Sequence, residues 1–564
     1  MTTQPHLLRR LIAVVIALGL SFTAVPVSQA QQESTTIEMK DFGLGEITSF
    51  QGQSTEVPFI IPVPPGITPT RLTGTFQLPA EYAGGTIELY SGRRLRESIS
   101  LEVKGFLADV EIPLDKVEII DGQAVFSLRA VMDVKDEQWC VDEPELKFLD
   151  GAVEYSGEAR HPEVLADFLP PILKVLSIYV PAEPSEHVQQ ATLELATSLA
   201  SVYRATGVDV RVLPLEEGET QPSSVPEQRE RQIVISGSGN PGMRLMNPGQ
   251  DDLYLHITGE DTGIADQARL MTDSLLPLAA DDQVETLGFG DIPDVSTEVA
   301  TLRELGNYAL ESESLARTQV FITVERSQLR PFVESFDLRL TGSYTPLPDS
   351  QAGQISVRVG DDVVDFFTAD DTGIIDRTFT IPSDLIGRYT DIVVEYRTTG
   401  DIGCGTTQPV GLQINGESMV STVHTDVPML SGFLALPQAF QPAVDVTLAG
   451  DNVENLARAV RIMVGVQSLS SERIRPQVVS WDEAVDSPRS TLFVDPAGEL
   501  SHEVPLYISE EGTKFTVVHA EDGGGVKGKD LLGSVEAEEE PEIISEELGY
   551  FYQLRTRDKL EAGA

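Results

Sequence analysis

The sequence predicts a multidomain protein in which a β-sandwich followed by an α/β domain occurs twice in tandem. Three observations support this fold class: a long internal duplication, two stretches of short β-type segments, and strands that alternate with helices after each stretch. The chain has 564 residues, a length at which about four domains are ordinary.

The duplication is visible in sequence features that recur at a nearly constant distance. Cys140 opens a run that ends at Asp150-Gly151, and Cys404, 264 residues later, opens a run that ends at Asn415-Gly416. Further pairs are Ile112-Pro113 with Ile381-Pro382, Phe168-Leu169 with Phe433-Leu434, and the helix-like runs that begin at Val188 and Val453. Such a long repeat indicates that one composite unit occurs twice.

Residues 1–30 have the pattern of a secretory signal peptide. Arg9-Arg10 precede an apolar run over 11–20, and Ser28-Gln29-Ala30 supply small residues before the expected cleavage site. The apolar run is short for a membrane anchor, and no later segment approaches the ~18 apolar residues that a spanning helix needs. We therefore expect a mature chain that is secreted or periplasmic, in a compartment where disulfides persist.

Residues 45–160 and 318–425 are predicted to be jelly-roll β-sandwiches. Their apolar segments are short, often alternate with polar residues, and are rich in β-branched and aromatic side chains, as in 71–78, 124–131 and 391–396. Gly, Pro and Asp separate them at close spacing, which is typical of sandwiches and jelly rolls.

Residues 165–290 and 430–520 are predicted to be α/β domains. In the first, an apolar strand at 175–180 precedes a helix over 188–202, and Gly207 ends that helix. Strands at 208–213, 232–236 and 253–258 and a helix over 264–276 follow, which favours a mostly parallel sheet with flanking helices. The second copy begins with a strand at 443–448 and a helix but is shorter. The acidic tail, 521–564, has too few apolar residues for a core and is expected to be partly disordered.

The charge is extreme, because 89 acidic residues face 40 basic ones for a net charge of −49. No Lys lies between Lys174 and Lys514. Acid enrichment with Lys depletion indicates a halophilic protein, because salt screens the self-repulsion of such a surface. The alternative is an acidic secreted protein without salt adaptation. Either surface excludes nucleic acid and anionic lipid as partners.

The order of domains resembles the extracytoplasmic B subunit, or regulatory subunit, of bacterial cellulose synthase. The residues that carry the resemblance run from Cys404 through Ile414-Asn-Gly-Glu-Ser and over 432–440, and the likeness covers roughly 45–500. It implies jelly-roll domains similar to carbohydrate-binding modules that alternate with flavodoxin-like domains. The final segment differs, because the family ends in a membrane-spanning helix and no such segment is found here.

The resemblance implies a non-catalytic accessory subunit that guides exported β-1,4-glucan outside the membrane. Its partner would be the membrane-embedded catalytic subunit of cellulose synthase, a glycosyltransferase, through which the chain would associate with the membrane. Family annotations mention cyclic di-GMP, but no binding motif for it is seen here. The alternatives are a free secreted carbohydrate-binding or adhesion protein on the same scaffold and, from another class, an enzyme that uses an α/β domain.

No catalytic, cofactor-binding or metal-binding residues are predicted. Gly237-Ser-Gly-Asn-Pro-Gly242 fits a dinucleotide-binding pattern, but Asn247-Pro-Gly leaves no room for the helix that must begin at its third Gly. We therefore interpret it as a structural loop. The seven His residues do not have metal-ligand spacing, and no G-x-S-x-G nucleophile motif occurs.

Two sets of residues are predicted to have specific roles. Cys140 and Cys404 are the only cysteines, occupy equivalent positions in the repeat and are expected to form one disulfide. Possible glycan-binding aromatic residues are Trp139, Tyr82, Tyr90 and Tyr344. Trp139 adjoins Cys140, so a buried role beside the disulfide is the competing interpretation.

Overall fold

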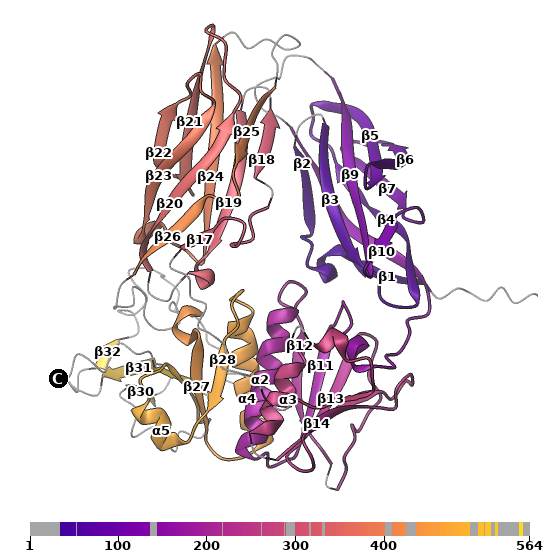
Figure 1. Cartoon of the computed structure of the whole chain (residues 1–564), viewed down its shortest axis with the longest axis vertical. Helices are drawn as coiled ribbons and strands as arrows, with labels where there is room; N and C mark the ends of the chain where they lie inside the picture. Colours follow the sequence, from indigo (N-terminus) through magenta and orange to yellow (C-terminus); the bar gives the residue numbers. More distant parts are fainter. Residues whose placement is uncertain are drawn as a thin grey trace, which may run out of the picture.

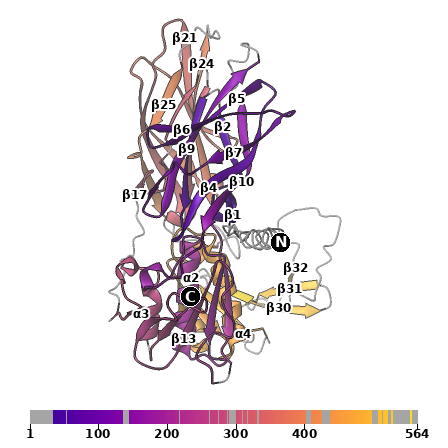
Figure 2. The same ribbon diagram turned by 90° about the vertical axis from the view of Figure 1, so that its right-hand side faces the viewer.

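The computed structural model describes residues 34–496 with internal gaps, the longest at 136–143, 289–298, 401–408 and 425–435, and strand segments between 506 and 555. Two β-sandwiches stand side by side over a pair of α/β units (Figures 1 and 2). The signal-peptide region, Trp139 and the predicted Cys140–Cys404 disulfide lie outside the described residues. No described helix combines the length and apolar character needed to cross a membrane.

The first β-sandwich consists of two antiparallel sheets, as predicted, but the predicted range, 45–160, leaves out the first strand, β1. One sheet runs β1-β10-β4-β7, with β2 also on β10, and the other runs β3-β9-β5-β6, with β8 on β9. Successive side chains of each strand point alternately into the core and toward solvent. In β7, for example, Ala108, Val110 and Ile112 are buried and their neighbours are exposed. The strands are β1 (Ser34–Glu38), β2 (Ile47–Gln51), β3 (Ser54–Pro62), β4 (Ile67–Gln77), β5 (Tyr82–Ser91), β6 (Arg94–Ser100), β7 (Leu107–Pro113), β8 (Glu118–Ile120), β9 (Gln123–Val134) and β10 (Glu145–Gly157), with η1 (Met39–Phe42) after β1.

The second β-sandwich repeats this arrangement. Its sheets run β17-β26-β20-β25-β18, with β23 on β20, and β19-β24-β21-β22. The predicted range, 318–425, leaves out β17 and β18, which pair with β26 and β25. The strands are β17 (Val299–Thr301), β18 (Glu311–Ser314), β19 (Arg317–Glu325), β20 (Val333–Tyr344), β21 (Gln351–Val359), β22 (Asp362–Thr368), β23 (Ile374–Pro382), β24 (Tyr389–Gly400), β25 (Val410–Ile414) and β26 (Met419–His424), with η4 (Arg326–Gln328) and η5 (Ser383–Leu385) between strands.

The repeated pairs Asp150-Gly151 and Asn415-Gly416 mark the same irregularity in both sandwiches. In the first, the pairing of β10 with β4 shifts register between Leu149 and Ala152, and Asp150 has a left-handed φ of 51°. In the second, a turn over 415–418 separates β25 from β26, and both strands pair with β20. The repeated Asp/Asn-Gly pair therefore marks, in both sandwiches, the point at which one long strand is interrupted.

The first α/β unit contains the sheet β12-β11-β13-β15-β14-β16. Strands β12, β11, β13 and β15 are parallel, and β14 is antiparallel to β15 and β16. The glycine-rich pattern that ends at Gly242 leads into strand β14, so no helix begins there. The elements are η2 (Leu165–Asp167), β11 (Val175–Val180), α2 (Glu186–Val202), β12 (Asp209–Pro214), β13 (Glu230–Ser236), β14 (Gly242–Met246), β15 (Tyr254–Thr258), α3 (Gly263–Leu270), η3 (Leu276–Leu278) and β16 (Gln283–Val284).

The second α/β unit contains the smaller sheet β28-β27-β29-β33. Its first three strands are parallel, and β33, from the acidic tail, lies antiparallel to β29. The elements are η7 (Gln438–Phe440), β27 (Ala443–Leu448), α4 (Val453–Gln467), β28 (Arg475–Val478), α5 (Trp481–Asp486), β29 (Thr491–Val494) and β33 (Tyr552–Arg555). A separate three-stranded sheet contains β30 (Leu506–Glu511), β31 (Lys514–His519) and β32 (Gly525–Lys527).

The two α/β units share one hydrophobic core. A single cluster of buried side chains includes Leu195 and Leu199 of α2 together with Val460 and Met463 of α4. Helices α2 and α4 lie between the two sheets (Figure 1). Helix α2 contacts β28 of the second unit, and α4 contacts β12, the equivalent strand of the first. This reciprocal contact has the form of a twofold dimer interface within one chain.

Ion pairs fix the sandwiches to the α/β layer. Asp41 of the first sandwich accepts hydrogen bonds from Lys174 Nζ (2.6 Å) and Arg229 Nη1 (3.1 Å) of the first α/β unit. Glu325 of the second sandwich accepts from Arg204 Nη1 (3.0 Å) in the first α/β unit and from the backbone N–H of Ser471 (2.7 Å) in the second. Each sandwich is therefore joined to the α/β layer through a charged group, whereas the two α/β units share an apolar core.

Candidate functional site

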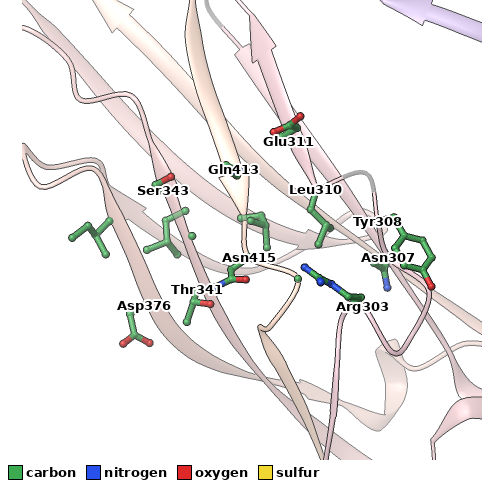
Figure 3. Close-up of a pocket in the computed structure, with 15 residues that line it drawn as sticks. Arg303, Asn307, Tyr308, Leu310, Glu311, Thr341, Ser343, Asp376, Gln413 and Asn415 are labelled. Carbon is green, nitrogen blue, oxygen red and sulfur yellow. The ribbon is translucent and has the colours of Figure 1, made fainter. Parts of the chain in front are cut away.

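An open groove of about 1020 Å³ lies on the second β-sandwich. Its floor is formed by β18, β25, β20 and β23, and one wall is formed by the segment between β17 and β18 (Figure 3). The lining residues are Arg303, Asn307, Tyr308, Leu310, Glu311, Thr341, Gly342, Ser343, Ile374, Ile375, Asp376, Gln413, Ile414, Asn415 and Gly416.

One row of exposed side chains, three polar and one apolar, crosses the four strands of the floor. Gln413 of β25 lies opposite Glu311 of β18 on one side and Ser343 of β20 on the other. Ser343 in turn lies opposite Ile374 of β23. Because directly paired residues project from the same face of a sheet, these four exposed side chains form one continuous surface.

A second row lies beside the first. Thr341 of β20 lies opposite Asp376 of β23, and the backbone N–H of Asn415 donates to the carbonyl oxygen of Thr341 at 2.8 Å. The side chain of Asn415 also accepts from the backbone N–H of Glu417 at 3.0 Å, which orders the turn. The turn after β25 therefore presents a fixed amide at the edge of the groove.

The wall contributes an aromatic ring, an amide and a guanidinium group. Tyr308 is 79% exposed. The Asn307 side chain donates to Thr323 O and accepts from Thr323 N, both at 2.9 Å, so this amide is held rigidly. The Arg303 backbone N–H donates to Gly416 O at 3.0 Å, and its Nε lies 3.7 Å from Glu417 Oε1.

The loop that carries this wall is ordered by Glu304. Its carboxylate accepts hydrogen bonds from the backbone N–H (2.8 Å) and the hydroxyl (2.9 Å) of Thr301. These hydrogen bonds, the backbone one first, lower the pKa of Glu304. The loop is therefore braced by a charged group at neutral pH.

Asp376 and Glu311 are the acidic groups of the floor, and Asp376 is the one held by a bidentate partner. Arg339 binds it with two hydrogen bonds, Nε to Oδ1 at 3.0 Å and Nη2 to Oδ2 at 3.1 Å. The hydrogen bond from Arg339 lowers the pKa of Asp376, with the guanidinium charge as a smaller cause. The carboxylate therefore stays ionised, but its charge is balanced from outside the groove.

The equivalent loop of the first sandwich has a different role. There the segment between β1 and β2 carries Asp41, which docks on the α/β unit, and the buried Met39 packs against Gly151. In the second sandwich the corresponding Gly416 lies under the exposed Arg303. The space beside this glycine is thus filled by the apolar side chain of Met39 in the first sandwich, whereas in the second it borders the open polar groove.

The aromatic residues predicted from the sequence do not line this groove. Tyr82 and Tyr344 are only 2% and 5% exposed, and Tyr344 Oη donates to Asp370 Oδ1 at 2.8 Å. Tyr90 is half-buried, and its hydroxyl donates to Glu88 at 2.9 Å. The ring faces of Tyr82 and Tyr344 are covered by the core and are not available for stacking on a sugar.

None of the groove residues was predicted as a binding residue, and five of them come from 303–311. This segment lay outside the predicted sandwich because β17 is very short and β18 reads Glu-Ser-Glu-Ser, without an apolar residue. The duplication contained the missing signal, since β17 and β18 repeat β1 and β2 of the first copy. Extending the repeat to Val299 would have placed Tyr308 in a β domain.

The groove presents hydroxyl, amide, guanidinium, carboxylate and aromatic groups, and it can therefore bind a ligand through hydrogen bonds and ring contacts. In the described part of the chain, no group of three or more His, Cys, Asp and Glu side chains is arranged to hold a metal ion.

A Ser–His contact lies in the first α/β unit, with Ser236 Oγ 2.8 Å from His256 Nε2. Burial lowers the pKa of His256, which keeps this ring neutral.

Comparisons with known proteins give no family. No family model and no curated protein matches the chain. Among solved structures it is similar to the carbohydrate-binding module TmCBM61 bound to β-1,4-galactotriose, with 14% identity over 22% of this chain and 81% of that one and a TM-score of 0.14. It is also similar to the CBM36-1 domain of a xylanase from a Trinervitermes trinervoides hindgut metagenome, with 11% identity over 20% of this chain and 75% of that one and a TM-score of 0.12.

A third similar structure is a family two carbohydrate esterase from Clostridium thermocellum bound to cellohexaose, with 8% identity, 36% of this chain, 66% of that one and a TM-score of 0.13. TM-scores of this size give no basis for assigning fold or function.

Proposed function

We propose that this chain is an extracytoplasmic, non-catalytic glycan-binding protein that holds a neutral polysaccharide in the groove of its second β-sandwich. The observation that carries the proposal is the groove itself: two rows of hydrogen-bonding side chains beside the exposed ring of Tyr308. Sugars present hydroxyl groups at their edges and C–H groups on their faces. A site of this kind needs amides and hydroxyls for the edges and an aromatic ring for a face.

The charges of the groove favour a neutral ligand. Asp376 is already paired with Arg339, and Arg303 lies near Glu417. The only cation among the lining residues is Arg303, whereas Glu311 and Asp376 are both acidic. A polyanionic glycan would also meet the field of a chain with net charge −49.

The finer assignment is a β-1,4-glucan and a role as accessory subunit of a cellulose-type polysaccharide synthase. It is supported by the resemblance in domain order and by the parallel strand order β12-β11-β13-β15, which has the 2-1-3-4 pattern of a flavodoxin-like sheet. In this assignment the α/β layer orients the sandwiches, and a membrane-embedded glycosyltransferase supplies the polymer. A free secreted glycan-binding protein would use the same groove without that partner.

Affinity electrophoresis with cello-oligosaccharides tests the proposal. We expect Tyr308→Ala to weaken binding by about five- to tenfold, because one aromatic contact is lost. Phe106→Ala is the matched control, since Phe106 is an exposed aromatic residue of the first sandwich outside the groove. An anionic glycan should bind more weakly than the neutral one, and the difference should shrink with added salt.

Two outcomes would count against the proposal. If Tyr308→Ala and Phe106→Ala bind like the parent protein, the groove is not the glycan site. If incubation with cello-oligosaccharides releases reducing ends, the non-catalytic assignment is wrong.

A further inference from the structure

The outer face of the sheet β19-β24-β21-β22 carries two exposed phenylalanines that the groove does not use. Phe321 of β19 is 57% exposed and Phe366 of β22 is 63% exposed. Phe321 lies opposite Val393, Val393 opposite Arg358, and Arg358 opposite Val363. One residue row thus crosses all four strands on one face, with apolar side chains at both edges.

The neighbouring row is polar in the middle and ends in the second ring. Gln319 lies opposite Glu395, Glu395 opposite Ser356, and Ser356 opposite Phe366. We call the surface formed by these two rows the phenylalanine face. With strands about 4.8 Å apart and residues rising about 3.4 Å along a strand, the Cα atoms of Phe321 and Phe366, three strand spacings and two residues apart, lie roughly 16 Å from each other.

The centre of the phenylalanine face is a rigid charged network. Glu395 is nearly buried and accepts hydrogen bonds from Gln319 Nε2 (2.7 Å) and Arg317 Nε (2.8 Å). Arg358 Nη2 lies 3.5 Å from the same carboxylate oxygen. These interactions join polar side chains of three neighbouring strands around Glu395.

The first β-sandwich lacks this pair of rings. By strand register, the position of Phe321 is occupied there by Pro58, which lies opposite Ser127. The position of Phe366 is occupied by Ser98, which lies opposite Glu88. Both phenylalanines therefore belong to the copy that also carries the open groove.

The distribution of apolar and charged groups favours an extended ligand over a globular protein partner. Protein–protein interfaces concentrate apolar residues at their centre, deplete charge there and place polar groups at the rim. The phenylalanine face has the reverse order, with Phe321 and Phe366 on the edge strands and Glu395 in the middle. A ligand that touches both rings must be long, narrow and rich in hydroxyl groups.

We propose that the phenylalanine face is a second glycan-binding surface, on which a neutral pyranose polymer stacks on Phe321 and Phe366 and forms hydrogen bonds to the polar groups between them. The proposal extends the ligand class of the proposed function to a second site on the opposite sheet of the same sandwich. Because the rings are far apart, the face distinguishes long chains from short ones. A disaccharide contacts one ring, whereas a longer chain contacts both.

Titration of the full chain with cellobiose and with cellohexaose tests this. The double variant Phe321→Ala/Phe366→Ala should lose one of the two cellohexaose sites of the parent protein, while cellobiose, held mainly in the groove, should bind nearly as well. Tyr308→Ala should weaken both ligands and leave residual cellohexaose binding at the phenylalanine face. Phe106→Ala is again the control, and the melting temperature of each variant reports folding.

The outcomes separate the two sites. Unchanged cellohexaose binding by the double variant would overturn the phenylalanine face as a glycan site. Equal loss of cellobiose and cellohexaose binding in the double variant would also overturn it, because the two rings would then not favour long chains over short ones. Failure of the groove alone would appear as a Tyr308→Ala variant that binds like the parent while the double variant still loses cellohexaose.

Discussion

Glu194 is a residue at which the two α/β units meet. It lies on α2, is almost fully buried, and its Oε1 accepts from Arg269 Nε of the first unit (3.1 Å) and Arg473 Nη2 of the second (2.7 Å). Burial lowers the pKa of Arg473, and the nearby Glu194 carboxylate opposes that effect. One carboxylate therefore balances a guanidinium group from each half of the duplication.

Removing this carboxylate should destabilise the whole α/β layer. We expect Glu194→Ala to lower the free energy of unfolding by about 2–4 kcal/mol, because two partly buried guanidinium groups lose their partner. Glu111→Ala is the control, since Glu111 forms an exposed surface pair with Arg71 and should cost less than about 1 kcal/mol. Denaturant titration measures both, and similar values for the two variants would contradict this role.

Gly151 and Gly416 occupy equivalent positions in the two sandwiches, but their surroundings differ, so alanine should have a different effect at each. A Cβ at Gly151 would lie 2.3 Å from Met39 Sδ and 2.8 Å from a ring carbon of Phe148, both buried. Gly151→Ala should therefore cost about 1–3 kcal/mol through overpacking. At Gly416 the nearest atom, at 3.2 Å, belongs to the exposed Arg303 side chain, which can move away.

Gly416→Ala should accordingly change stability by less than about 0.5 kcal/mol. It should weaken glycan binding several-fold, because it displaces the guanidinium group at the groove. Thermal unfolding and affinity electrophoresis on the two variants check both halves of the prediction. A Gly416→Ala variant as unstable as Gly151→Ala would show that the second position is packed like the first.

At the scale of elements, the long periodic segments were predictable and the short polar ones were not. The strand Val175–Val180 and helix α2 follow from continuous apolar residues and a 3.6-residue period. Strand β14 was missed because Asn247-Pro-Gly, just after it, indicated a loop, yet it pairs with β15 over five residues. Strand β33 was missed because only pairing with β29 makes a strand of a short segment in an acidic tail.

The candidate site was predictable only as a class. Alternating strands and the repeat indicated two β domains, and the resemblance in domain order implied glycan binding, but the aromatic candidates Tyr82 and Tyr344 are used for core packing. Burial of a tyrosine depends on which face of its strand meets the opposite sheet, and this requires strand register. The wall residues Arg303 and Tyr308 belong to a loop, where periodicity gives no information.

The loop between β1 and β2 makes docking of the first sandwich sensitive to acid. Burial alone would raise the pKa of Asp41, but hydrogen bonds from Lys174 and Arg229 outweigh it, so the pKa is lowered. A carboxyl group with a lowered pKa stabilises the folded state above its unfolded pKa, near 4, and this stabilisation is lost as pH falls through the folded value.

We therefore expect the melting temperature of the parent protein to fall more steeply below about pH 4 than that of Asp41→Asn. The variant should be less stable at pH 7, since Lys174 and Arg229 then lack their charged partner. Scanning calorimetry from pH 3 to pH 7 gives both curves. Parallel curves would show that Asp41 does not couple docking to protonation.

At the scale of the whole molecule, the net charge of −49 sets the response to salt. Repulsion among so many carboxylates is long-ranged in dilute buffer, and at 1 M salt the Debye length falls to about 3 Å. We expect the melting temperature to rise by several degrees between dilute buffer and molar KCl, measured by scanning calorimetry. A constant melting temperature would contradict the halophilic interpretation.

The reciprocal packing of α2 on β28 and of α4 on β12 has a consequence for the ancestry of the chain. A half-length precursor with one sandwich and one α/β unit would have left an apolar helix bare, and it would have covered that helix by pairing with an identical subunit. Two such units within one chain keep the pair together permanently, and neither half has to serve both sides of the symmetry. In the present chain one loop anchors its sandwich through Asp41, and the equivalent loop borders the groove with Arg303.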